Sequence, residues 1–247
     1  MVNILGVKFH RVTMEQALEK VDSLMKEPGP QLIVTANTEM VMMANQDPLL
    51  FEIIRRSALV VPDGIGIVWA SRILNCPLEE RVPGVELMDK LLERSAEKGW
   101  RVFLLGAKPG IADQAAENAK KKYAKLNVVG TYHGYFTKEE EQELISRIKA
   151  AKPDLLFLAL GVPKQEKWAA ANLAKLGIPL AMGVGGSFEI LAGTTKRAPK
   201  WMCRSGLEWL YRLIKEPWRI GRMMALPQFA ILIMLEKMIV KGDLKDA

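Results

Sequence analysis

Short apolar runs alternate with helical patterns through the first 195 residues of this 247-residue chain. The runs at 102–105, 155–160 and 180–184 are apolar at consecutive positions, which is typical of strands covered on both faces. Stretches with helical periodicity separate them. This alternation predicts an α/β fold built on a mostly parallel, doubly wound sheet with helices on both faces.

The expected elements follow from the same pattern. Strands are expected at 3–7, 32–36, 59–61, 102–105, 128–132, 155–160 and 180–184. Helices are expected at 13–25, 38–45, 64–74, 85–98, 111–123, 138–151 and 164–174. The first of these helices has a capping-box signal, because Thr13 is followed three residues later by Gln16.

A change of charge and pattern at 193–204 divides the chain. Residues 196–247 carry 11 Lys and Arg against 5 Asp and Glu, whereas residues 1–195 carry 24 against 23. We therefore predict an α/β domain at 1–195 and a basic, aromatic appendage at 196–247. Prolines are expected to divide this appendage into short helical pieces, since proline ends or begins a helix. They are Pro199, Pro217 and Pro227.

Cationic and aromatic residues are mixed in this appendage. Trp201, Trp209, Tyr211 and Trp218 lie among its arginines, a mixture that suits an anionic membrane surface or a phosphate-bearing ligand. The alternative is a solvated basic tail. A spanning helix needs roughly 20 apolar residues, and the most apolar stretch, 229–235, is too short. The segment 229–240 could lie in the membrane interface or pack on protein.

The amino terminus and the cysteines indicate a compartment. No basic region followed by a long apolar run begins the chain, so no signal peptide is expected. Cys76 and Cys203 lie far apart without metal-binding spacing, which is typical of free thiols in a reducing compartment. We expect a cytoplasmic protein.

Polar residues and glycines follow five of the predicted strands, at the edge where open parallel sheets bind ligands. These exits are 35–39 (Thr-Ala-Asn-Thr-Glu), 62–66 (Pro-Asp-Gly-Ile-Gly), 106–110 (Gly-Ala-Lys-Pro-Gly), 161–166 (Gly-Val-Pro-Lys-Gln-Glu) and 183–189 (Gly-Val-Gly-Gly-Ser-Phe-Glu). A single exit is weak support, because such turns need glycine for steric reasons. Five together predict a ligand site.

Two of these exits supply candidate substrate-binding residues, because glycines let backbone N–H groups approach a phosphate. The candidates are Gly106, Gly183, Gly185, Gly186, Ser187 and Glu189. Ser187 is expected to cap the next helix and face an anion. The sequence leaves open whether Glu189, Lys108 or Tyr135 touches a nucleotide. Neither GxGxxG nor GxxxxGK[ST] is present, which disfavours a standard dinucleotide or P-loop fold.

Asp63 is the first candidate for a catalytic carboxylate. It lies between an apolar strand and a pair of glycines, where an aspartate can accept a proton from a substrate hydroxyl. Its alternative role is to cap the helix that begins near Gly64.

Neither a metal nor another cofactor is expected. The chain has two histidines and no DxD pair, the motif with which many sugar-nucleotide transferases hold a divalent ion. If a diphosphate leaves, arginines suit its charge because their planar fork binds phosphate bidentately. The candidates are Arg81 in the body and Arg212, Arg219 and Arg222 in the appendage. The alternative for each is a surface ion pair.

The motifs, in this order, resemble the WecG/TagA/CpsF glycosyltransferase family over essentially the whole chain. They are 35–39, 62–64, 81–86 (Arg-Val-Pro-Gly-Val-Glu), 161–166, 183–189, 196–199 (Lys-Arg-Ala-Pro) and 206–212 (Gly-Leu-Glu-Trp-Leu-Tyr-Arg). The similarity is strongest to the branch that makes the first committed sugar transfer of wall teichoic acid synthesis.

The resemblance implies transfer of N-acetylmannosamine from UDP-ManNAc to the 4-hydroxyl of GlcNAc on undecaprenyl diphosphate. It implies an inverting, metal-independent reaction that forms a β-linkage. It also implies a Rossmann-like catalytic domain and an appendage that engages the inner face of the cell membrane and completes the active site. By this resemblance Asp63 is the general base, and Thr35, Asn37 and Gln165 line the sugar and acceptor pocket. The arginines of the appendage would bind the departing diphosphate.

Three other interpretations remain at this point. The same chemistry could use another donor, such as UDP-ManNAcA or UDP-glucose. The chain could instead be a nucleotide-binding membrane adaptor without catalysis. A nucleic-acid binder would fit the basic pI of about 9.3, but the nearly neutral body and the lack of a recognised binding motif argue against it. The sequence does not determine whether the chain forms a homo-oligomer.

Overall fold

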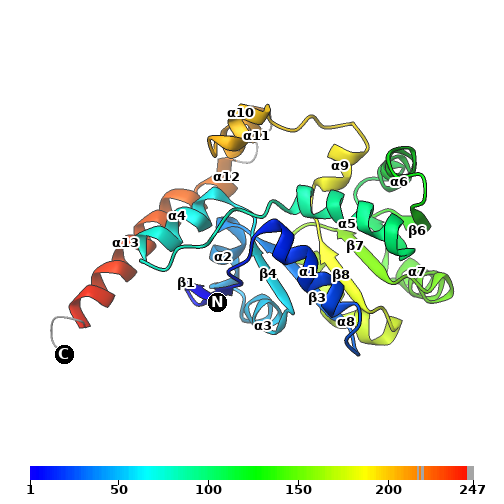
Figure 1. Cartoon of the computed structure of the whole chain (residues 1–247), viewed down its shortest axis with the longest axis horizontal. Coiled ribbons are helices and arrows are strands. Elements are labelled where there is room, and N and C mark those ends of the chain that lie inside the picture. Colours follow the sequence, from blue (N-terminus) through cyan, green and yellow to red (C-terminus); the bar gives the residue numbers. More distant parts are fainter. Residues whose placement is uncertain (216, 218–219, 244–247) are drawn as a thin grey trace.

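The predicted α/β architecture is confirmed by a computed structural model, which describes residues 1–215, 217 and 220–243, except for the side chains of 204, 212, 222 and 240–243. A six-stranded sheet has the order β4-β3-β8-β7-β5-β6, and all its neighbouring strands are parallel (Figure 1). Its strands are β3 (Gln31–Ala36), β4 (Leu59–Pro62), β5 (Arg101–Gly106), β6 (Asn127–Tyr132), β7 (Leu155–Ala159) and β8 (Leu180–Gly183).

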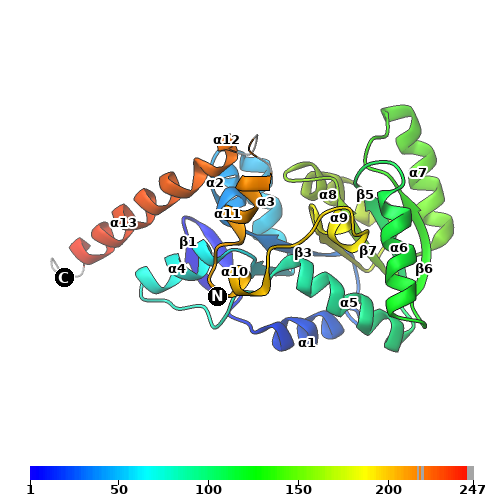
Figure 2. The same ribbon diagram turned by 90° about the horizontal axis from the view of Figure 1, so that it is seen from above.

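Helices cover both faces of this sheet. Those of the body are α1 (Met14–Leu24), α2 (Thr38–Ala44), α3 (Pro48–Arg56), α4 (Ile65–Ile73), α5 (Gly84–Lys98), α6 (Ile111–Lys122), α7 (Lys138–Ala151), α8 (Lys164–Leu176) and α9 (Ser187–Leu191). Seen from above, α1 and α5 lie on one side of the sheet and α2, α3 and α8 on the other (Figure 2). The capping box that begins α1 is present as predicted, with Gln16 N–H donating to Thr13 Oγ1 at 3.2 Å.

The core explains why the strand sequences are apolar at consecutive positions. On β7, Leu155 and Phe157 pack with α1, α5 and α6, whereas Leu156 and Leu158 pack with α7 and α8. Successive side chains of a strand point to opposite faces, so a strand covered on both sides needs no polar positions.

The strand predicted at 3–7 is wrong. Residues 2–9 form a separate antiparallel hairpin of β1 (Val2–Ile4) and β2 (Val7–Phe9). Leu5 and Gly6 make its two-residue turn, with φ angles of +47° and +85°. Positive φ at both central residues matches the twist of a tight hairpin, so the chain reverses where the apolar run looked continuous.

Helix α3 was not among the expected helices, although its signals are in the sequence. Asp47 accepts a hydrogen bond from Leu50 N–H at 3.1 Å, and Pro48 is the first helical residue. A capping aspartate followed by proline is typical of a helix start.

In the described part of the chain after the body, the helices are α10 (Lys200–Arg204), α11 (Glu208–Lys215), α12 (Ile220–Met223) and α13 (Ala225–Asp243). The expectation of short pieces is wrong for α13, which has 19 residues and contains Pro227 in its first turn, where proline is tolerated. It extends away from the body at one end (Figure 1). Phe229 and Ile233 are buried in the same core as residues of α2 and α4. Among the described residues, no helix is long and apolar enough to cross a membrane.

Candidate active site

The carboxyl ends of the strands open into a cavity of about 770 Å³. The loops that follow β3, β4, β5, β7 and β8 line it, as expected where parallel strands end together. Of the predicted site residues, it brings together Thr35, Asn37, Asp63, Arg81, Gln165, Gly185, Gly186, Ser187 and Glu189. A second cavity of about 840 Å³ shares Lys108, Tyr135, Gly186 and Glu189 with the first.

Asp63 lies directly after β4 at the wall of the first cavity. Its backbone N–H donates to the carbonyl of Ala36 at 3.0 Å, and its carboxylate Oδ1 accepts from Gly84 N–H at 2.9 Å. Gly84 is the first residue of α5, so a helix N-terminus orients this carboxylate. The N-cap residue of α4 is Gly64, which has no side chain, whereas the Asp63 carboxylate binds the N-terminus of α5. The alternative role of Asp63, capping the helix that begins near Gly64, stays a prediction.

The three polar residues expected to line the sugar pocket hold the loops together. Thr35 Oγ1 donates to the carbonyl of Gly183 at 3.2 Å, which joins the end of β3 to the end of β8. Asn37 Oδ1 caps α2 by accepting from Met40 N–H at 2.9 Å. Gln165 is 2 % exposed and its Oε1 accepts from Gly185 N–H at 3.2 Å. Their contact with a substrate stays a prediction.

Two of the four candidate glycines line the first cavity and two lie outside both cavities. Gly106 and Gly183 do not line either cavity. A Cβ on Gly106 would lie 2.4 Å from the backbone of Ala159, and one on Gly183 would lie 2.5 Å from Gln165 Nε2. Both therefore allow close packing behind the site.

Gly185 and Gly186 line the first cavity, but the Gly185 N–H is already bound to Gln165. Ser187 does not cap α9 as expected. The N-cap residue of α9 is Gly186, and Ser187 is the first helical residue. Ser187 Oγ donates to the carbonyl of Val184 at 2.7 Å.

Glu166 lies behind this loop and was not predicted as a site residue. Its side chain is 1 % exposed, and Oε1 accepts from Gln165 Nε2 at 2.8 Å. Burial raises the pKa of Glu166 to about 7, although the hydrogen bond from Gln165 opposes the shift. Desolvation dominates because a buried carboxylate loses its hydration.

This shift predicts a pH-dependent stability. Between the ordinary pKa of 4.5 and about 7, the folded state holds a proton that the unfolded state has released. The free energy of unfolding therefore falls as the pH rises through this window, by about 3 kcal/mol in all. Glu166→Gln should remove that fall, measured by urea unfolding from pH 4.5 to 8. Glu143→Gln, at an exposed position of α7, is the control; equal slopes in wild type and Glu166→Gln would contradict the shift.

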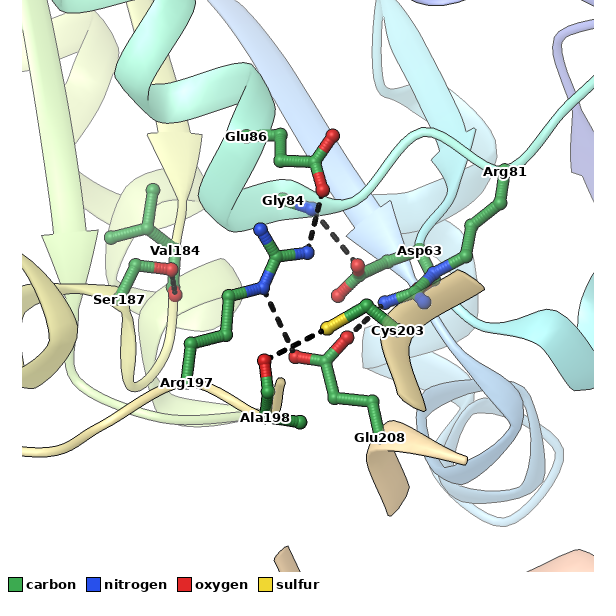
Figure 3. A network of polar contacts seen from close by, with 10 residues as sticks. All are labelled: Asp63, Arg81, Gly84, Glu86, Val184, Ser187, Arg197, Ala198, Cys203 and Glu208. Atoms are coloured by element: carbon green, nitrogen blue, oxygen red, sulfur yellow. Dashed lines mark hydrogen bonds and ion pairs between the residues drawn. The ribbon is translucent and has the colours of Figure 1, made fainter. Parts of the chain in front are cut away.

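Arg81 contacts the backbone of Asp63 and the side chain of Glu208 in the appendage. Its Nε donates to the Asp63 carbonyl at 2.9 Å, and its Nη2 lies 2.7 Å from Glu208 Oε2 (Figure 3). Arg197 Nε lies 3.6 Å from Glu208 Oε1, and its Nη2 lies 2.6 Å from Glu86 Oε1. The interpretation of Arg81 as a diphosphate ligand stays a prediction beside this ion pair.

The side chains of the three appendage arginines lie outside the described part of the structure. The backbones of Arg212 and Arg222 belong to α11 and α12, but their side chains are not described, and Arg219 is not described at all. Sequence reasoning did not assign roles to Glu86, Arg197 or Glu208. Their signal was present, since all three lie in motifs of the family pattern.

Comparison with known proteins identifies the family of this chain. Residues 2–242 match the model of the family described as "Glycosyl transferase WecG/TagA/CpsF family". The chain is 37 % identical to N-acetylglucosaminyldiphosphoundecaprenol N-acetyl-beta-D-mannosaminyltransferases of Staphylococcus aureus strains MW2 and NCTC 8325 / PS 47. Each alignment covers 242 residues, 97 % of this chain and 94 % of the relative.

Proposed function

The chain belongs to the WecG/TagA/CpsF family of glycosyltransferases, and from this premise we propose that it moves N-acetylmannosamine from UDP-ManNAc to the 4-hydroxyl of GlcNAc on undecaprenyl diphosphate. This would be an early step of wall teichoic acid synthesis. The observation that carries the proposal is Asp63, a carboxylate oriented by Gly84 N–H at the wall of a cavity of about 770 Å³.

In the proposed reaction, the 4-hydroxyl oxygen attacks the anomeric carbon of the donor from the face opposite UDP. Asp63 accepts the hydroxyl proton, the new C–O bond forms, and the bond to the diphosphate breaks, so UDP leaves with its electron pair. One displacement inverts the anomeric configuration and yields a β-1,4 linkage. The step needs one base and no carboxylate nucleophile, and we assign the base to Asp63.

The leaving diphosphate needs positive charge near the site. The adjoining cavity of about 840 Å³ is lined by Lys108, Lys196, Arg197 and Lys215. Cations aimed at the developing charge stabilise the transition state without a metal ion, and Arg212, Arg219 and Arg222 would add to them when the appendage completes the site. We therefore propose a metal-independent transferase.

The test is release of UDP from UDP-ManNAc in the presence of EDTA and a lipid-diphosphate-GlcNAc acceptor. We expect release that depends on the acceptor and is unaffected by EDTA. Release only from UDP-glucose or UDP-ManNAcA would keep the reaction and change the donor. Failure to turn over any of these donors would reject the transferase and favour a nucleotide-binding adaptor.

The lipid-linked acceptor would require the enzyme to work at the inner face of the cell membrane as a peripheral protein. Phe229 and Ile233 attach α13 to the body, while Ile231, Met238 and Ile239 are between 60 % and 65 % exposed. We propose that this apolar side of α13 (Ile231, Met238 and Ile239) meets anionic lipid, helped by the basic residues of 196–247.

Charged substitutions on this apolar side should weaken membrane binding. Each isoleucine transferred from lipid to water costs roughly 2 kcal/mol, so Ile231→Glu with Ile239→Glu should lower binding to phosphatidylglycerol vesicles more than about 10-fold. Co-sedimentation with vesicles measures this. Leu49→Glu, at a 57 % exposed position of α3, is the control. Equal binding by all three proteins would contradict the lipid contact.

A further inference from the structure

Glu208 lies at the point where the C-terminal segment meets the candidate base. It is the first residue of α11 and only 6 % exposed, and it lines the first cavity. Figure 3 shows its carboxylate between the guanidinium groups of Arg81 and Arg197, with one oxygen turned toward each. A carboxylate that bridges two cations in this way is poorly suited to take a proton from a substrate.

Two routes lead from Glu208 to Asp63. In the first, Arg81 Nη2 binds Glu208 while Arg81 Nε donates to the carbonyl of Asp63 at 2.9 Å. In the second, Arg197 pairs with Glu208 and with Glu86, which lies in the first turn of α5. The first residue of that turn, Gly84, donates to Asp63 Oδ1.

These contacts hold Asp63 at both its carbonyl and its carboxylate. Both routes begin at one residue of the C-terminal segment, 127 positions after Arg81. Removing one partner from a buried ion pair leaves an uncompensated charge, so the loss of Glu208 should release both arginines from their positions.

Building on the proposed function, we propose that Glu208 is a positioning residue for the transfer reaction. Acting through Arg81 and through Arg197 with Glu86, it orients Asp63 toward the acceptor hydroxyl, so the base is aligned when residues 197–208 are docked on the body. A misplacement of about 1 Å at a reacting group can lower a rate about 100-fold.

Glu208→Gln tests this proposal because it keeps the shape of the side chain and removes its charge. In the full-length enzyme we expect kcat to fall about 10- to 100-fold, while the KM for UDP-ManNAc changes less than about 3-fold. Glu52→Gln is a matched control, since Glu52 also binds two arginines, Arg55 and Arg56, but on α3 and away from both cavities. Its kcat should equal that of wild type.

A charge swap separates positioning from simple docking. Arg81→Glu combined with Glu208→Arg can rebuild the ion pair between these two positions, but it cannot donate to the Asp63 carbonyl and it loses the pairing with Arg197. The swap should recover part of the thermal stability relative to either single variant while kcat stays low. Recovery of full turnover, or a Glu208→Gln kcat within 2-fold of wild type, would overturn the proposal.

Hydrogen exchange gives a readout that does not depend on the donor or on turnover. Peptides covering 81–87 should exchange faster in Glu208→Gln than in wild type and Glu52→Gln, because the Gly84 N–H loses its fixed acceptor. Unchanged exchange would overturn the positioning role. A wild-type enzyme that turns over no donor, with exchange altered as expected, would instead reject the proposed function alone.

Discussion

Replacing Asp63 by asparagine should lower kcat for acceptor-dependent UDP release by roughly 10²- to 10⁴-fold, the usual contribution of a general base. The asparagine Oδ1 can still accept the hydrogen bond from Gly84 N–H, which is 2.9 Å long in the native protein. The variant should therefore fold normally and bind the donor, with a KM within about 3-fold of wild type. Steady-state kinetics with UDP-ManNAc measure both constants.

A carboxylate on α5, the helix whose first residue donates a hydrogen bond to Asp63, supplies the control for Asp63→Asn. Asp89 lies on α5 and pairs with Lys122 at 2.7 Å, outside both cavities. Asp89→Asn should leave kcat unchanged. A rate for Asp63→Asn within 10-fold of wild type would show that another group accepts the proton, and the proposed mechanism would then be wrong.

The largest expected effect on stability is at Gly106. Its φ angle is +137°, and a Cβ would lie 2.4 Å from backbone atoms of Ala159, which cannot move without separating β5 from β7. Overpacking and the unfavourable backbone conformation together should lower the free energy of unfolding of Gly106→Ala by at least about 3 kcal/mol. Urea unfolding at constant pH measures this.

Gly110, in the same loop, separates the steric effect from the backbone effect. Its φ is +82°, but no atom of the residues that the structure describes lies within 4 Å of a Cβ placed there. Gly110→Ala should therefore cost only about 1 kcal/mol. Equal losses at the two positions would mean that close strand packing does not explain the need for glycine at 106.

Much of the fold could be predicted because its signals are local. The strand at 155–160 and the helix at 138–151 follow from apolar runs and helical periodicity, and both are confirmed. The hairpin at 2–9 was missed because its turn is made by Leu5 and Gly6. Neither is a polar residue, so the turn was read as part of the strand. Helix α3 was missed although Asp47 and Pro48 signal its start.

The location of the site was predictable for a topological reason. Parallel strands end at one edge, and there Asp63 after β4 and Gln165 after β7 line one cavity. The jobs of individual residues were less predictable. Ser187 was expected to cap a helix, but its hydroxyl has a nearer acceptor in the carbonyl of Val184.

By itself, the sequence determined the α/β class, the family and the edge of the sheet that holds the site, because periodicity and motif order are properties of neighbouring residues. Only the tertiary structure decided which partners those residues take. The bonds of Asp63 to Gly84 and of Arg81 to Glu208 join segments 21 and 127 positions apart. A carboxylate or a guanidinium can bind many partners with similar local signals, so the folded packing selects among them.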